Sequence, residues 1–283
     1  MKTVNSLSGG KTSSYMAVHY PADYNIFSLV RTSDTKCMFP DPKVRQMVSD
    51  RIGTEFIGTL EQDTIIYTML DLEQFIGKEI TWLTGRTFDE IIIRKDKKYL
   101  PNVMQRFCTI EMKLDPINKW WWDNVQEVVE MRLGFRANET KRATNMMKRC
   151  DADGIMLEKF IVGKRNDGKN KWKQFPMRKP AFPLIEDGVY KDTIVDYWAS
   201  KEVRFAFMNN CVGCFHRNEL LLNKMSQIEP TKMQWFVDAE QENGETVRTF
   251  KKGITYEKIK NHKLQTDLFE DDFNECDSGY CGL

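Results

Sequence analysis

The stretch that indicates the fold is Ser8-Gly9-Gly10-Lys11-Thr12-Ser13, close to the N-terminus. It follows a β-like run over residues 3–7 and leads into a helical stretch over residues 14–19. Glycines let the backbone approach a ligand closely, and the first N–H groups of a helix attract an anion. Serine hydroxyls and a lysine charge add to this attraction, so the stretch predicts a phosphate or pyrophosphate site.

The glycine spacing separates this stretch from two common nucleotide motifs. It fits neither G-x-x-x-x-G-K-[ST] nor G-x-G-x-x-G. It resembles the S-G-G-x-D-S pyrophosphate loop of the PP-loop ATP pyrophosphatases and their phosphoadenylyl-sulfate (PAPS) reductase relatives. This resemblance assigns nucleotide or pyrophosphate binding to six residues: Ser8, Gly9, Gly10, Lys11, Thr12 and Ser13. Thr12 stands where the family carries an acidic residue, which changes the expected contacts to Mg²⁺–ATP. A Ser/Gly-rich turn without a ligand is the alternative.

Composition and charge exclude several classes of protein. The net charge of +1 over 283 residues gives no global preference for nucleic acid or a membrane surface. No apolar run approaches the roughly 20 residues that span a bilayer, and no signal peptide precedes the motif. We expect a cytoplasmic protein without a membrane partner and leave its oligomeric state open. Seven cysteines in such a chain favour metal, redox or core roles over disulfides.

Strand and helix signals alternate over the first half of the chain. Strands are predicted at residues 25–30, 54–58 and 128–133, with helical segments between them. The resemblance implies an α/β fold with a mostly parallel sheet and helices on both faces, of the adenine nucleotide α-hydrolase (HUP) type. It also implies a nucleotide-binding domain over residues 1–205 and a helical, cysteine-rich module over residues 206–283.

Polar residues follow the predicted strand at residues 25–30, and Asp34 is one of them. Ligands bind at the carboxyl ends of strands in open α/β sheets. The resembled family carries a polar motif near the adenosine at this point, so Asp34 is a candidate nucleotide-binding residue. An aspartate that caps the next helix is the alternative.

A second motif lies at residues 106–116, with Arg106 and Lys113 near a helix start. Two cations seven residues apart lie on one face of an α-helix, two turns apart, and can grip separate anionic groups. The segment looks like the R-x-C-T-x-x-x-K-x-x-P motif of PAPS reductase-like proteins. The resemblance implies substrate-binding roles for Arg106, Lys113 and Cys108, whereas a solvated helix face and a buried thiol are the alternatives.

The predicted strand at residues 128–133 ends in a glycine and a charged loop. This loop resembles the G-x-R-x-[DN]-E-x-x-R motif of the same group. Gly134 would allow the nucleotide to approach closely, and Arg136 and Arg142 would neutralise phosphate oxygens. Glu139 would orient these arginines, bind Mg²⁺ or contact the substrate. An ordinary surface loop is the alternative.

A basic hairpin with an Asp-Gly turn is predicted at residues 164–174. Its charge density, together with Trp172, would suit a nucleic-acid backbone. The alternative is an exposed hairpin surrounded only by solvent.

Two close cysteine pairs lie in the last third of the chain. Cys211 and Cys214 form a C-x-x-C, and Cys276 and Cys281 lie near the C-terminus. Four thiolates suit Zn²⁺ or an iron–sulfur cluster. Iron–sulfur members of the family hold a [4Fe–4S] cluster in this part of the chain. In a competing interpretation, Cys281 resembles the catalytic C-terminal cysteine of assimilatory PAPS reductases, although the flanking Glu and His of that motif are missing.

The function implied by the resemblance is ATP-dependent adenylation that releases AMP and pyrophosphate and is coupled to sulfur transfer. Lys11, Arg136 and Arg142 would be its catalytic residues, and ATP and Mg²⁺ its cofactors. The partners would be a small-molecule or nucleic-acid acceptor and a sulfur donor protein. A sulfonucleotide reductase is the near alternative. A nucleotide- or nucleic-acid-binding module without catalysis is the alternative of another class.

Overall fold

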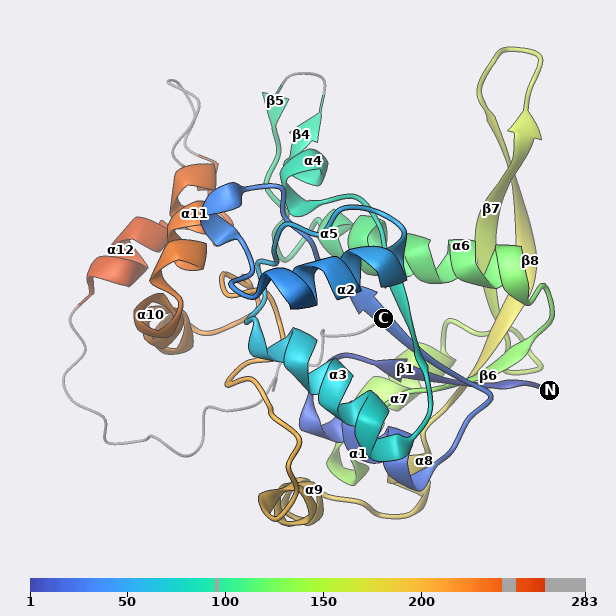
Figure 1. Ribbon diagram of the computed structural model, residues 1–283. Helices are drawn as coiled ribbons and strands as arrows, with labels where there is room; N and C mark the ends of the chain where they lie inside the picture. Colours follow the sequence, from blue (N-terminus) through green and yellow to red (C-terminus); the bar gives the residue numbers. More distant parts are fainter. Residues whose placement is uncertain (95–96, 241–247, 263–283) are drawn as a thin grey trace. The chain divides into compact units, whose positions relative to one another are not determined.

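The computed structural model describes residues 1–94, 97–240 and 248–262 (Figure 1). The chain divides into two compact units, each assembled from three segments. Unit 1 comprises Met1–Phe27, Asp71–Thr81 and Ile117–Val203. Unit 2 comprises Ser28–Leu70, Trp82–Pro116 and the described part of Arg204–Leu283. The C-terminal segment is therefore part of a unit that also contains two earlier stretches of the chain.

A six-stranded sheet has the strand order β3-β2-β1-β6-β8-β7. The strands are β1 (Thr3–Leu7), β2 (Tyr24–Leu29), β3 (Ile80–Thr84), β6 (Val129–Arg132), β7 (Met156–Lys164) and β8 (Asn170–Ala181). The β1–β2, β1–β6 and β6–β8 pairs are parallel, and β7 and β8 are antiparallel. The predicted α/β class with a mostly parallel sheet is confirmed.

The strand order places a topological switch point between β1 and β6. The chain passes from β1 to β2 and β3 on one side, then returns to β6 on the other side of β1. The two central strands are buried, with Val4, Val129 and Met131 all at 0% exposure. Ligands of open α/β sheets bind outside the carboxyl ends of the strands at such a switch point. The segments that follow β1 and β6 are therefore the candidate ligand-binding segments of the sheet.

Helices alternate with these strands along the chain (Figure 1). The helices that precede residue 110 are α1 (Lys11–His19), α2 (Pro42–Ile52), α3 (Thr64–Ile76), α4 (Phe88–Ile92) and α5 (Phe107–Thr109). The later ones are α6 (Asp115–Asn124), α7 (Thr140–Met147), α8 (Pro183–Glu186), α9 (Lys191–Ala199), α10 (Glu219–Ile228), α11 (Pro230–Glu240) and α12 (Tyr256–Asn261). A small hairpin joins β4 (Ile93–Arg94) to β5 (Lys97–Lys98). In the part of the chain that the structure describes, none of these helices has the length and apolar character needed to cross a bilayer.

The predicted strand at residues 54–58 is wrong. These residues form no strand, and Gly58 makes only isolated backbone bridges with Thr32 and Met38. A Cβ atom on Gly58 would lie 2.0 Å from the carbonyl oxygen of Cys37. The segment is therefore held by a close backbone approach rather than by a strand ladder.

The C-terminal helices share the hydrophobic core of unit 2. Phe236 on α11 contacts Phe88, Phe250 and Tyr256 with ring centroids 5.6, 5.4 and 6.3 Å apart. The Tyr256 hydroxyl donates to the carbonyl oxygen of Gly213 at 2.9 Å. These contacts fix the backbone of the C-x-x-C segment against α11 and α12.

Candidate functional site

The loop at residues 8–13 forms a closed turn at the carboxyl end of β1. Gly9 adopts a left-handed conformation with φ of 77°, which favours glycine. The backbone N–H of Ser8 donates to the Ser13 hydroxyl at 3.1 Å, and that hydroxyl donates to the Gly10 carbonyl at 3.2 Å. The Ser8 and Ser13 hydroxyls lie 3.1 Å apart. The serines therefore shape the turn that presents the first N–H groups of α1.

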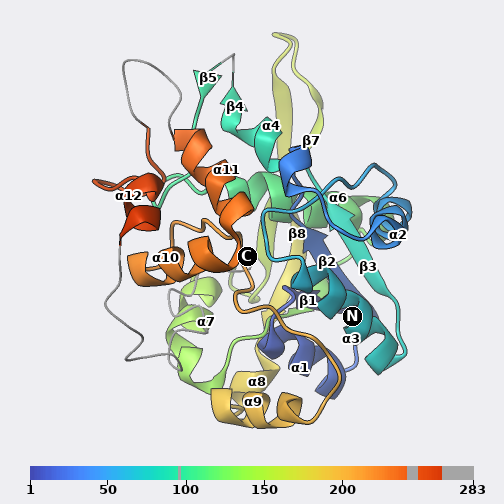
Figure 2. The ribbon, with the colours of Figure 1, turned by 60° about the vertical axis from the view of Figure 1, so that its left-hand side comes forward.

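The start of α1 is fixed by a tryptophan on α9. Trp198 Nε1 donates to the carbonyl oxygen of Lys11 at 3.0 Å. In both ribbon views, α1 lies beside α8 and α9 (Figures 1 and 2). Gly10 caps α1 in an extended conformation, and Lys11 and Thr12 are its first residues. The helix N-terminus is therefore anchored through the backbone, independently of the Lys11 side chain.

Gly134 lies against this loop. A Cβ atom on Gly134 would be 3.3 Å from both the Cα and the N of Ser13 and 3.4 Å from Thr12 Cγ2. The sequence predicted a close approach of Gly134 to a nucleotide. The structure brings Gly134 close to the turn that is predicted to hold the nucleotide, because β1 and β6 are parallel neighbours that end at the same edge. The predicted pyrophosphate loop at residues 8–13 and the predicted glycine–arginine motif that begins at Gly134 are therefore adjacent in the fold.

Glu139 joins the two predicted arginines. Its carboxylate accepts from the backbone N–H of Arg136 at 2.8 Å, from Arg136 Nε at 3.2 Å and from Arg142 Nη1 at 2.5 Å. Burial acts to raise the pKa of Glu139, but the Arg136 N–H and the Arg142 guanidinium outweigh it and the pKa is lowered. Glu139 thus forms ion pairs with both arginines, the contacts that the orienting role requires. Two guanidiniums therefore share this one carboxylate.

Arg142 is also held by an aromatic stack. Its guanidinium carbon lies 4.1 Å from the centre of the Phe135 ring, which stacks on Phe182 with centroids 5.3 Å apart. Arg142 Nε is buried and has no hydrogen-bond partner among the residues that the structure describes. A buried donor without a partner favours an anionic acceptor at this position.

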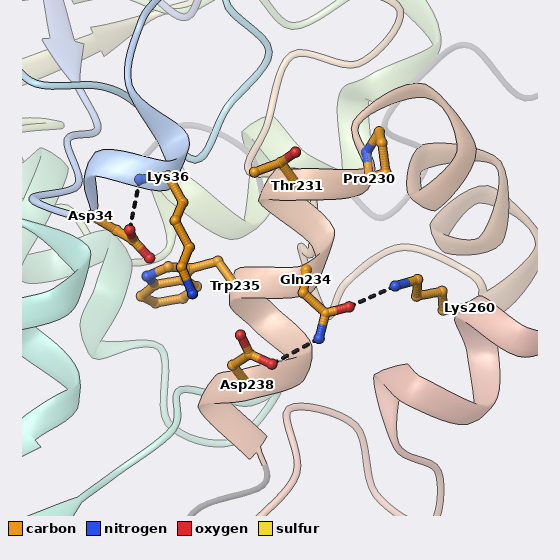
Figure 3. A pocket seen from close by; sticks show the side chains of 8 residues that line it. All are labelled: Asp34, Lys36, Pro230, Thr231, Gln234, Trp235, Asp238 and Lys260. Carbon is orange, nitrogen blue, oxygen red and sulfur yellow. Dashed lines mark hydrogen bonds between the residues drawn. The ribbon is translucent and has the colours of Figure 1, made fainter.

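In unit 2, Asp34 caps a short 3-10 helix over Thr35–Cys37, as the alternative interpretation held. Its carboxylate accepts from the backbone N–H of Lys36 at 2.8 Å. Asp34 also lines a cavity of about 290 Å³ (Figure 3). The other lining residues are Lys36, Pro230, Thr231, Gln234, Trp235, Asp238 and Lys260.

Hydrogen bonds order the wall of this cavity that α11 and α12 form. Lys260 Nζ donates to Gln234 Oε1 at 2.6 Å, and Gln234 Nε2 donates to Asp238 Oδ1 at 2.7 Å (Figure 3). Trp235 Nε1 donates to Asp89 Oδ1 at 2.9 Å, which fixes the indole at the cavity wall. No sequence motif indicated this cavity, because its two walls are about 200 residues apart in the chain.

The predicted helical face of Arg106 and Lys113 is wrong. Arg106 precedes α5 with φ −95° and ψ 41°, and residues Ile110–Leu114 form a π-helical turn. The wider i→i+5 turn means that seven residues no longer equal two α-helical turns. Lys113 Nζ instead forms a 3.0 Å ion pair with Glu61, whose side chain is 2% exposed. Glu61 belongs to no sequence motif, so no sequence signal indicated it.

Three cysteines of unit 2 share one electrostatic neighbourhood. Burial and then the nearby Cys214 raise the pKa of the Cys108 thiol to about 11. Burial, Glu61, Cys214 and Cys108 raise the pKa of the Cys211 thiol. The C-x-x-C closes as a turn in which the N–H of Cys214 donates to the Cys211 carbonyl at 3.0 Å. Cys108, predicted as a substrate-binding residue, therefore lies near the C-x-x-C.

The predicted partners Cys276 and Cys281 lie outside the described residues. Within residues 1–94, 97–240 and 248–262, no group of three or more His, Cys, Asp or Glu side chains is arranged to hold a metal ion. The donor chemistry of the three thiols fits a soft metal or an iron–sulfur group, whereas their present arrangement is not a formed metal site.

No family model, no curated protein and no solved structure matches the chain.

Proposed function

We propose that this protein binds an adenine nucleotide and transfers its adenylyl group to an acceptor, with release of pyrophosphate. One observation carries the proposal. The hydroxyl-closed glycine turn after β1 meets the glycine–arginine segment after β6 at the switch point of a parallel sheet. Such an edge suits a nucleotide. The resemblance to PP-loop ATP pyrophosphatases and the HUP-type fold is part of the same proposal, as is a cytoplasmic location.

The chemistry follows from the charges at this edge. The N–H groups at the start of α1 and the Lys11 ammonium hold the β- and γ-phosphates. Arg136 and Arg142, positioned by Glu139, neutralise charge on the phosphates. An acceptor oxygen attacks the α-phosphorus, and the bond to the bridging oxygen breaks as pyrophosphate leaves with the electron pair. The rate comes from orientation and charge stabilisation without a covalent enzyme intermediate. Bound Mg²⁺ would supply further neutralisation of phosphate charge.

Sulfur transfer is the proposed second half of the reaction. A sulfur nucleophile from a donor protein would displace AMP from the adenylated acceptor. Cys108, Cys211 and Cys214 would hold a [4Fe–4S] cluster or Zn²⁺, with Cys276 or Cys281 as a further ligand. The Cys108 and Cys211 thiols have raised pKa values, so metal binding at neutral pH would release their protons.

Two alternatives are tested by the same experiment. A sulfonucleotide reductase would use the turn for PAPS and Cys281 as its nucleophile. A binding module without catalysis is favoured by Thr12, which takes the place of an acidic residue in the resembled loop.

Calorimetric titration of anaerobically purified protein with Mg²⁺–ATP, AMP and PAPS distinguishes these functions. We expect ATP to bind more tightly than AMP, because the triphosphate occupies the whole anion site. We also expect AMP and pyrophosphate to appear when a sulfur donor and an acceptor are present. Preference for PAPS would favour the reductase. Failure of all three nucleotides to bind would overturn the proposed site.

Metal analysis tests the role of Cys108. After anaerobic reconstitution with iron and sulfide, or with Zn²⁺, we expect Cys108→Ser to lose most of the bound metal, as Cys211→Ser does. Cys150→Ser is the matched control, because Cys150 belongs to unit 1 and lies outside the core cluster that contains Cys108. Full metal content in Cys108→Ser together with loss in Cys211→Ser would remove Cys108 from the ligand set.

A further inference from the structure

The β7–β8 hairpin of unit 1 continues as a two-stranded ribbon beyond the rest of the sheet (Figure 1). Strand β8 pairs with β6 only over Arg178–Ala181. Its pairing with β7 continues to Lys164↔Asn170. The tip closes through bonds from the Arg165 N–H to the Lys169 carbonyl at 2.8 Å and from the Gly168 N–H to the Arg165 carbonyl at 2.9 Å. The predicted hairpin with an Asp-Gly turn is confirmed.

The base of the ribbon is fixed by aromatic packing. Trp122 on α6 stacks on Phe160 with centroids 4.9 Å apart and meets Phe175 edge-on at 5.1 Å. Phe160 and Phe175 come from the two strands of the ribbon and lie 5.8 Å apart. This packing orients the ribbon before any partner binds, which reduces the entropy that binding costs.

The ribbon carries a dense positive charge on exposed side chains. Between residues 159 and 174 there are six cationic side chains and one carboxylate, a net charge of +5 in a chain whose total is +1. The cations are Lys159, Lys164, Arg165, Lys169, Lys171 and Lys173. All residues of 161–169 and 171–174 are exposed. The positive charge is therefore concentrated on this ribbon, and the net charge of the whole chain does not reveal this concentration.

An apolar pair lies among these cations. Ile161 and Trp172 are opposite each other in the strand register and are 50% and 54% exposed. Successive side chains of a strand point to opposite faces, so Lys171 and Lys173 lie on the face opposite Trp172. Lys159 and Lys164, which pair with Gln174 and Asn170 in the register, lie on the Trp172 face. Cations therefore occur on both faces of the ribbon and at its turn. The Trp–Ile pair packs across the two strands and stabilises the ribbon, and it also presents an apolar surface among the cations.

We propose that the β7–β8 ribbon binds duplex DNA. A two-stranded antiparallel ribbon fits the major groove of B-form DNA, and phosphates border that groove on both sides. Cations on both faces and at the turn match this arrangement. An anionic membrane would instead favour an apolar face separated from a cationic one. This interaction does not depend on the nucleotide chemistry proposed for the turn after β1.

The test is a binding titration of the full chain with a labelled 20-base-pair DNA duplex across a range of salt concentrations. Each lost phosphate contact lowers the slope of log K against log salt by about 0.9. We therefore expect Lys171→Ala/Lys173→Ala to lower the slope by about 1.8 and to weaken binding roughly 60-fold at 0.1 M salt. Lys252→Ala/Lys258→Ala is the matched control, because it removes two exposed lysines of unit 2 and changes the net charge equally. We expect the control to bind like the unmodified protein.

Three outcomes would overturn the proposal. The first is no salt-dependent binding to the duplex, and the second is equal weakening by the ribbon and control variants. The third is binding to vesicles of anionic lipid but not to DNA. Duplex RNA is the remaining comparison, and we expect weaker binding because its deep, narrow major groove does not admit the ribbon. Lys11→Ala should leave DNA binding unchanged, so a failure of the nucleotide site is distinguishable from a failure of the ribbon.

Discussion

Replacing Lys11 with alanine is expected to weaken Mg²⁺–ATP binding about 30-fold and to lower adenylyl transfer about 100-fold or more. A charged hydrogen bond to phosphate contributes roughly 2 kcal/mol to binding, and a donor that stabilises developing charge contributes more to the rate. Lys11 is the first residue of α1, and its backbone is fixed through its carbonyl oxygen by Trp198. Calorimetry with ATP and measurement of pyrophosphate release under single-turnover conditions provide the two values.

The control for this change is Lys148→Ala, which removes an exposed lysine that directly follows α7 in the same unit. We expect the control to bind ATP normally and both variants to keep the thermal stability of the unmodified protein. ATP affinity that is unchanged in Lys11→Ala would remove the lysine from the anion site. Loss of stability in the same variant would mean that the side chain supports the fold instead.

Glu139→Gln is expected to lower the free energy of unfolding by about 3 kcal/mol at pH 7. The carboxylate is 12% exposed and compensates two guanidiniums that are 9% and 22% exposed, at Arg136 and Arg142. Removing one partner of a largely buried ion pair leaves charge without compensation. Urea denaturation of both proteins measures the difference. ATP binding should also weaken, because the arginines lose the group that orients them.

The stabilisation by the Glu139 carboxylate depends on pH, and the direction of its pKa shift determines how. The folded-state pKa of Glu139 is lowered, so its stabilising effect is fully present above the unfolded-state pKa of about 4.3. The effect is lost as the pH falls through the folded-state pKa. The difference between the two proteins should therefore shrink below about pH 4. A difference that stays constant from pH 7 to pH 3 would mean that packing, and not charge, accounts for the loss.

Glu130→Gln is the matched control for the carboxylate. Glu130 pairs with Arg132 at 2.8 Å in the same unit, but its side chain is 31% exposed. Exposed pairs contribute about 0–1 kcal/mol. We expect the control to change the free energy of unfolding by less than about 1 kcal/mol. A loss of unfolding free energy equal to that of Glu139→Gln would show that burial does not determine how much each ion pair stabilises the fold.

Local sequence was sufficient for the elements whose signals are short-range. The turn at residues 8–13, the flanking strand and helix, and the Asp-Gly hairpin follow from glycine conformation, capping and apolar patterning over a few residues. The α/β class follows from the alternation of such signals. The strand predicted at residues 54–58 was wrong because a short apolar run does not determine which backbone segment it contacts in the fold.

Only the tertiary structure decided which of these segments meet. Parallel pairing of β1 with β6 places Gly134 against Ser13, although some 120 residues separate them in the chain. Folding likewise brings Cys108 near the C-x-x-C and pairs Lys113 with the buried Glu61. The physical reason is that the sequence determines local backbone preference and side-chain chemistry. Strand order and burial, which depend on contacts distant in the chain, determine the neighbours of each charge and thiol.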